Sequence, residues 1–132
     1  MNKRAEKEIA YKKGDISYLD DNIFEYDAIE DLELAVKINN LATFRYLVEC
    51  IGLNPSIKFK DTHNEEYTIL ELIFKYYSDN LLEYIIEELG LYDPKDIITV
   101  LVPDKGTRKY DKMNNMLDII DRYGVKYKLI LS

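Results

Sequence analysis

Residues 32–37 read Leu-Glu-Leu-Ala-Val-Lys, and residues 70–75 read Leu-Glu-Leu-Ile-Phe-Lys. The second stretch follows the first after 38 positions (32 to 70), and the likeness continues through Gly52 and Gly90 at the same offset. In both copies the apolar residues that follow recur at i, i+3, i+4 and i+7, which is the pattern of one helix face. A repeat of fixed period predicts a row of similar units that bury their inner faces against one another.

The apolar face of the second half of the unit occurs three times. Its members are Phe44, Leu47, Val48 and Ile51, then Leu82, Ile85, Ile86 and Leu89, then Met116, Ile119, Ile120 and Tyr123. Each set is followed by a glycine, the residue that most readily adopts the left-handed conformation that ends a helix. We therefore predict an all-α fold of about four stacked helix pairs. They are expected at 3–12 with 15–24, 28–39 with 41–51, 67–77 with 79–89, and 94–102 with 112–123.

The chain resembles the ankyrin repeat family. Residues 68–73, Thr-Ile-Leu-Glu-Leu-Ile, stand where that family has Thr-Pro-Leu-His-x-Ala, and residues 10–15, Ala-Tyr-Lys-Lys-Gly-Asp, are similar to the segment between its two helices. Glu66, Ile69 and Glu71 depart from the family pattern. The resemblance implies one ankyrin-like solenoid domain over 1–132. Its end repeats, about 3–27 and 93–124, are irregular, and an extended tail at 125–132 is expected to cover the last helix.

Length and composition restrict the class of protein. The chain has 132 residues, 47% of them hydrophobic, with one cysteine and one histidine. This length suits one domain with its own core, and the single Cys50 cannot form an internal disulfide. The first residues lack the apolar stretch of a signal peptide, so we expect a cytoplasmic protein. A net charge of −7 does not favour direct nucleic-acid binding.

The acidic residues are concentrated in one part of the chain. Residues 14–103 carry nineteen acids against six bases, whereas residues 1–13 and 104–132 each carry more bases than acids. Between positions 15 and 33 there are eight acids and no base. Such a run is usually a solvated face. The alternative is a surface that attracts a basic partner, and the candidate contacts are Asp20, Asp21 and Glu25.

Three further places are candidate binding sites. In ankyrin-like proteins the loop between helix pairs touches partners, so the resemblance implies contacts at Asp61, His63 and Asn64; a polar turn is the simpler interpretation. Tyr76 and Tyr77 end a helix that faces the groove in that family, and aromatic side chains are frequent interface anchors. The segment 103–112 is a long basic connection with Lys105, Arg108 and Lys109, which is either functional or a plain insertion.

These patterns predict a binding protein rather than an enzyme. The five glycines form no phosphate-binding loop, and His63 has no second histidine or cysteine nearby, so no metal or other cofactor is expected. We expect a non-enzymatic module that binds a protein partner with a basic surface. The composition suggests a viral, phage or immunity-type inhibitor of a nucleic-acid-handling protein. A structural or oligomerisation module and a small metal-dependent hydrolase that uses the loop 61–65 are the alternatives.

Overall fold

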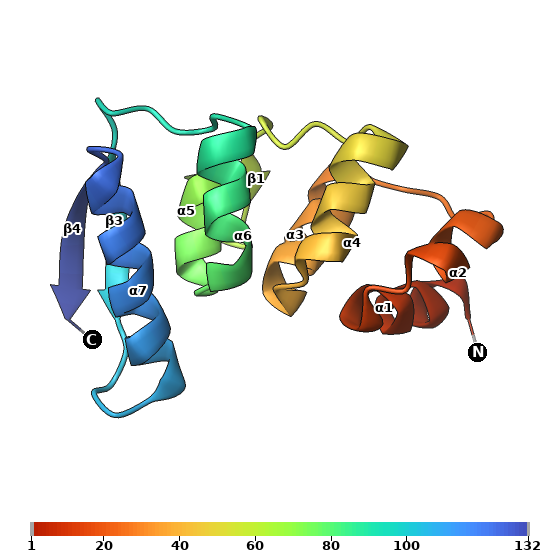
Figure 1. Cartoon of the computed structure of the whole chain (residues 1–132), viewed down its shortest axis with the longest axis horizontal. Helices are drawn as coiled ribbons and strands as arrows, with labels where there is room; N and C mark the ends of the chain where they lie inside the picture. Colours follow the sequence, from red (N-terminus) through yellow and green to blue (C-terminus); the bar gives the residue numbers. More distant parts are fainter. Residues whose placement is uncertain (1, 132) are drawn as a thin grey trace.

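The computed structural model describes residues 2–131 and shows three helix pairs side by side, closed at one end by a strand–helix–strand unit (Figure 1). The first pair is α1 (Lys3–Lys13) and α2 (Ile16–Asp21). In the second, α3 (Ala28–Ile38) is followed by α4 (Leu41–Arg45), which continues into the π-helical η1 (Tyr46–Ile51). In the third, α5 (Ile69–Lys75) is followed by α6 (Asp79–Glu83) and the π-helical η2 (Tyr84–Glu88). These helices lie where the periodicity predicts the first three pairs.

Short polar side chains start the helices. Asp15 accepts a hydrogen bond from the backbone N–H of Tyr18, and Asp27 accepts one from Glu30. Thr68 and Glu71 form a reciprocal capping box at the start of α5. Because these groups satisfy N–H donors that lack a partner within the helix, they fix where each helix begins. Two of the acids in the run 15–33 are therefore helix caps.

Buried hydroxyl groups join neighbouring helix pairs. The Thr43 hydroxyl donates to the carbonyl of Tyr11 (2.8 Å), and the Ser78 hydroxyl donates to the carbonyl of Val36 (2.5 Å). Both Thr43 and Ser78 are fully buried. Since a buried hydroxyl without a partner is costly, these bonds fix the position of each pair on the preceding one.

The fourth unit is not a helix pair, so the all-α prediction is wrong. Residues 94–102 contain the strand β3 (Ile97–Val102) in place of the expected helix; it is followed by α7 (Arg108–Arg122) and the strand β4 (Lys126–Leu131). Ile98 and Val100 are buried while their neighbours are exposed, which is the alternation of a strand. The segment Ile-Ile-Thr-Val-Leu-Val is rich in β-branched residues, which favour strands over helices.

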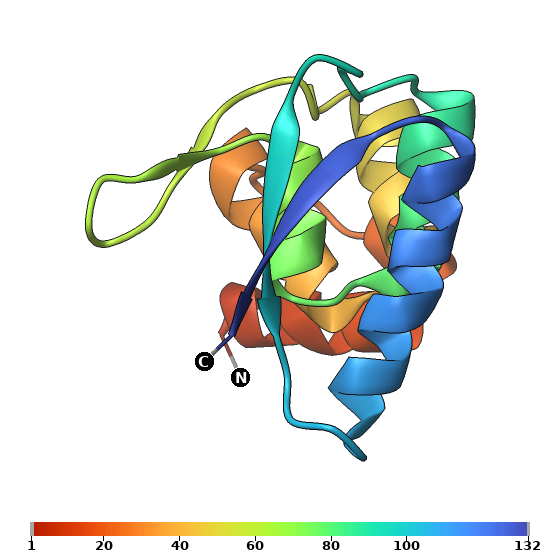
Figure 2. The ribbon, with the colours of Figure 1, turned by 90° about the vertical axis from the view of Figure 1, so that its left-hand side faces the viewer.

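The chain end is extended, as expected, but it pairs with β3 instead of covering the last helix. The two strands are parallel, in register from Ile97↔Lys126 to Val102↔Leu131. A second sheet, antiparallel, is the short hairpin of β1 (Phe59–Lys60) and β2 (Glu66–Tyr67), which projects from the body (Figure 2). Residues 1 and 132, at the limits of the expected domain and tail, lie outside the described residues.

The elements form two layers over a common core. One layer places α1, α3, α5 and β3 side by side, and the other contains α4, α6 and α7. In this arrangement β3 takes the place that a first helix would occupy in a fourth pair. The core between the layers includes the fully buried Tyr11, Phe44, Phe74 and Ile85. Within residues 2–131, no helix combines the length and apolar character needed to cross a membrane.

Candidate functional site

A groove follows the layer of first helices at the N-terminal end of the molecule. It is a hollow of about 950 Å³ between α1, the segment 23–27 and α3. We call it the first-helix groove. The residues that line it include four bases and six acids, so it is a mixed surface with a small acidic excess. This balance suits a polar or basic protein surface better than a nucleic acid.

The floor of the groove is held by a buried carboxylate. Asp31 is 3% exposed, and its Oδ1 lies 2.8 Å from the Lys7 ammonium and accepts a hydrogen bond from the Tyr11 hydroxyl (2.9 Å). Its Oδ2 accepts from the backbone N–H of Asp27 (2.7 Å). Lys7 also donates to the carbonyl of Glu25 (3.0 Å). This network ties α1, α3 and the segment between the first two pairs into one rigid surface.

Lysines and aromatic rings alternate along the groove and beyond it onto α5. In each pair the Nζ lies over the ring at a cation–π distance. The pairs are Lys3 over Phe24 (5.2 Å), Lys7 over Tyr26 (5.3 Å), Lys37 over Tyr76 (5.3 Å), and Lys75 over Tyr76 (5.6 Å) and Tyr67 (4.6 Å). The sequence indicated Tyr76 but not the rest of this row, because most of the pairs join residues from different elements.

The tyrosines of this row are neutral at physiological pH. Burial raises the pKa of Tyr26 to about 12, and burial together with the nearby Asp61 carboxylate raises the pKa of Tyr67 to about 12. Burial also raises the pKa of Tyr76, whose hydroxyl donates to Glu33 (3.3 Å). Neutral tyrosines offer an apolar ring and a hydroxyl at the same place, a combination enriched at protein interfaces.

The predicted acidic contacts lie beside the first-helix groove. Asp20, Asp21 and Glu25 are all exposed, and Glu25 lines the groove itself. Asp20 also accepts a hydrogen bond from the Tyr46 hydroxyl (3.4 Å), so it is less free than its neighbour. Next to them Ile23 is 91% exposed, because α2 ends at Asp21 before Ile23 can join its apolar face. A bare isoleucine between carboxylates is a feature that helical periodicity could not reveal.

The loop residues Asp61, His63 and Asn64 lie at the tip of the β1–β2 hairpin. Asp61 Oδ1 accepts from the backbone N–H groups of His63 (2.8 Å) and Glu65 (3.0 Å), and Oδ2 accepts from the Tyr67 hydroxyl (3.1 Å). The backbone hydrogen bond from Glu65 is the largest cause that lowers the Asp61 pKa. Asp61 therefore organises the turn, while the side chains of His63 and Asn64 are exposed at its tip.

Tyr77 and the basic segment lie away from the groove. Tyr77 is only 7% exposed and its hydroxyl donates to the carbonyl of Leu101, so it packs against β3. The loop expected at 103–112 is also shorter than predicted, because Thr107 caps α7 and the helix begins at Arg108. Arg108 and Lys109 are therefore helical, whereas Lys105 remains in the loop. All three basic side chains are exposed near the end of β3, and Lys109 lies 6.0 Å from the Tyr77 ring.

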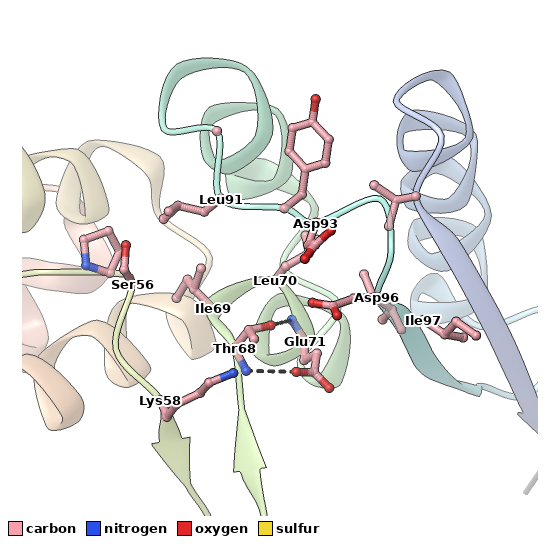
Figure 3. A pocket seen from close by; sticks show the side chains of 15 residues that line it. Ser56, Lys58, Thr68, Ile69, Leu70, Glu71, Leu91, Asp93, Asp96 and Ile97 are labelled. Atoms are coloured by element: carbon pink, nitrogen blue, oxygen red, sulfur yellow. Dashed lines mark hydrogen bonds between the residues drawn. The ribbon is translucent and has the colours of Figure 1, made fainter.

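A second hollow of about 480 Å³ lies between residues 55–58, the start of α5 and residues 90–98 (Figure 3). Its polar groups serve the local structure: Thr68 and Glu71 cap α5 at 3.2 and 3.0 Å, and Asp93 accepts from the Lys95 N–H (2.9 Å). Of the charged side chains in the hollow, Lys58 and Asp96 are the two that take no part in these bonds. A ligand would meet few polar groups ready to bind it.

In the part of the chain that the structure describes, no group of three or more His, Cys, Asp or Glu side chains is placed to hold a metal ion. In comparisons with known proteins, no family model, curated sequence or solved structure matches the chain. The resemblance to ankyrin repeats therefore stays a prediction. The function has to be inferred from the chain's own surfaces.

Proposed function

We propose that the protein is a binding module that holds a protein partner along the first-helix groove. The observation that supports the proposal most directly is the row of lysine–aromatic pairs, which continues across three helices and the β1–β2 hairpin. Rings flanked by charges, and surrounded by a polar rim, are typical of the anchors in protein interfaces.

The charges around the groove favour a basic partner. Lys7 and Lys37 are paired with Asp31 and Glu33 at 2.8 and 3.4 Å, so their charges are largely balanced within the chain. The exposed carboxylates in and beside the groove are Asp21, Glu25, Asp27 and Glu30, and they outnumber the other exposed bases of the groove, Lys3 and Arg4. Charges of this kind speed association with an oppositely charged protein and make it sensitive to salt. A cytoplasmic inhibitor of a nucleic-acid-handling protein, of viral, phage or immunity origin, fits this chemistry.

Ile23 offers the cleanest variant for a test. Because the side chain is already 91% exposed, Ile23→Ser removes an anchor for a partner and leaves the free energy of unfolding nearly unchanged. The matched control is Ile97→Ser, which removes another exposed isoleucine at the opposite end of the molecule. Asp21→Lys/Glu25→Lys reverses two exposed acids, and its control is Asp118→Lys/Asp121→Lys on α7.

Each double variant changes the net charge from −7 to −3, two units at each of two sites. The tagged proteins are used to capture partners from an extract of the source cells at about 0.1 M salt. We expect one protein to be held by the wild type and by both controls, and to be lost with the groove variants. Equal retention by all five proteins would contradict the proposal, and so would equal loss with the control variants.

A further inference from the structure

The sheet of β3 and β4 is unusual because it is parallel, has two strands and is open to solvent. Parallel sheets are normally covered on both faces, and two strands alone are marginally stable in water. Here α5 lies behind β3, and the opposite face of the sheet is bare (Figure 2). The register places Ile97 beside Lys126, Thr99 beside Lys128, and Leu101 beside Ile130 on this bare face, and all six are exposed.

Strand β4 extends beyond the core that supports β3. On the covered face, Ile98 and Val100 of β3 are buried, whereas their neighbours toward the end of β4 are not. Leu131 is 82% exposed and Leu129 is 46% exposed. In the part of the chain that the structure describes, these two leucines of β4 thus lie outside the core, Leu131 almost fully and Leu129 by about half.

The outer edge of β4 also has free backbone groups. Among residues 2–131, the hydrogen bonds of β4 are those of its ladder with β3. The other edge of the sheet is different, because the Tyr77 hydroxyl donates to the Leu101 carbonyl of β3. A row of unpaired N–H and C=O groups is a template for a further strand, and addition of such a strand is a common mode of peptide recognition.

The side chains of β4 indicate which strand would fit. Lys126 and Lys128 project from the bare face, and residues 104–132 carry seven bases against four acids. Lysines on an edge strand disfavour pairing with a second copy, since like charges would lie close together across the new ladder. The same lysines favour a strand that presents carboxylates to them, and Leu129 and Leu131 favour apolar side chains on its other face.

We propose that the free edge of β4 binds an extended segment of an acidic protein, in which acidic and apolar side chains alternate. The segment continues the sheet as a third strand. Its carboxylates face Lys126 and Lys128, and its apolar side chains cover Leu129 and Leu131. This site lies at the opposite end of the row from the first-helix groove (Figure 1), so the protein has a second surface whose charge preference is the reverse of the first.

The test uses three synthetic peptides with a fluorescent label, and binding is measured by fluorescence anisotropy. The first peptide alternates glutamate and valine over eight residues, and the second has lysine in place of glutamate. The third is the glutamate peptide with N-methyl groups on alternate residues, which removes the hydrogen bonds of one edge. We expect the wild-type protein to bind the first peptide about ten-fold or more tightly than either of the others, and more weakly as salt rises.

Lys126→Glu/Lys128→Glu should reverse the preference between the glutamate and lysine peptides. Both side chains are exposed, so the variant should melt at the temperature of the wild type. The control is Lys12→Glu/Lys13→Glu, at the far end of the molecule, with the same change in net charge and an unchanged preference expected. Hydrogen exchange should show slower exchange of the β4 amides when the glutamate peptide is bound.

Three results would overturn the proposal. Equal binding of the three peptides by the wild type would show that neither charge nor the backbone edge selects the ligand. A preference that survives in Lys126→Glu/Lys128→Glu would place the peptide elsewhere. A wild-type dimer in sedimentation, with the β4 amides already protected and the dimer lost in Leu129→Glu, would show that a second copy covers the edge.

Discussion

The substitution Asp31→Asn tests the network under the first-helix groove. In the native protein one carboxylate serves three partners: the Lys7 ammonium at 2.8 Å, the Tyr11 hydroxyl at 2.9 Å and the Asp27 N–H at 2.7 Å. An asparagine has nearly the same shape, but it has no charge for Lys7. It also turns one of the two oxygens into an N–H donor, which would then face another donor.

The expected loss of stability in Asp31→Asn follows from the burial of the charged groups. Breaking a buried ion pair by removing one partner costs about 3–5 kcal/mol. Because the Lys7 side chain is 14% exposed and keeps its bond to the Glu25 carbonyl, we expect the lower end, about 3 kcal/mol. This loss is a large part of the free energy of unfolding of a small domain, which is about 5–15 kcal/mol in total. With a urea slope of about 2 kcal/mol per M, the midpoint of unfolding should fall by about 1.5 M.

Urea unfolding followed by circular dichroism measures this shift. The matched control is Glu30→Gln, one residue earlier on the same helix, where the side chain is exposed. It should change the free energy of unfolding by less than about 0.5 kcal/mol. If the two variants unfold at the same urea concentration, Asp31 does not hold the groove together and the network described here is wrong.

Three further predictions concern packing and protonation. Ile85→Ala should destabilise the protein by about 2–5 kcal/mol, as for other large-to-small changes in a core, whereas Glu83→Ala on the exposed face should cost less than about 0.5 kcal/mol; equal urea midpoints would contradict the helix faces. Ser78→Ala removes a buried hydrogen bond to the Val36 carbonyl, which keeps its bond from the Asn39 N–H (3.1 Å), and should cost about 1 kcal/mol by the same measurement. The pKa of Tyr26 and of Tyr67 is about 12 in the folded protein, above the ordinary value of 10.0. Because the unfolded chain loses these protons first, their contribution to stability is complete below pH 10 and disappears between pH 10 and 12. Absorbance at 295 nm should show one fewer tyrosine ionising above pH 10 in each of the corresponding Phe variants.

The acidic run 15–33 shows which structural features can be predicted by counting charges along the sequence, and which cannot. The excess of carboxylates between positions 15 and 33 correctly indicated exposed acids at Asp20, Asp21 and Glu25. It could not separate them from Asp31, which is buried, or from Asp15 and Asp27, which cap helices. The lysine–aromatic row was equally hidden, since Lys37 and Tyr76 are distant along the chain and meet only because α3 and α5 lie side by side.

The sequence by itself determined the three helix pairs, because a period of 3.6 residues and short polar caps are local signals, and so are the glycines that follow α1, η1 and η2. Only the tertiary structure decided that the fourth unit is not a helix pair. The segment 97–102 has apolar spacing compatible with either a helix or a strand. Its β-branched residues become a strand because β4 returns beside it and satisfies its backbone hydrogen bonds. That partner lies some thirty positions further along the chain (97 to 126), and no local pattern within 97–102 reports its presence.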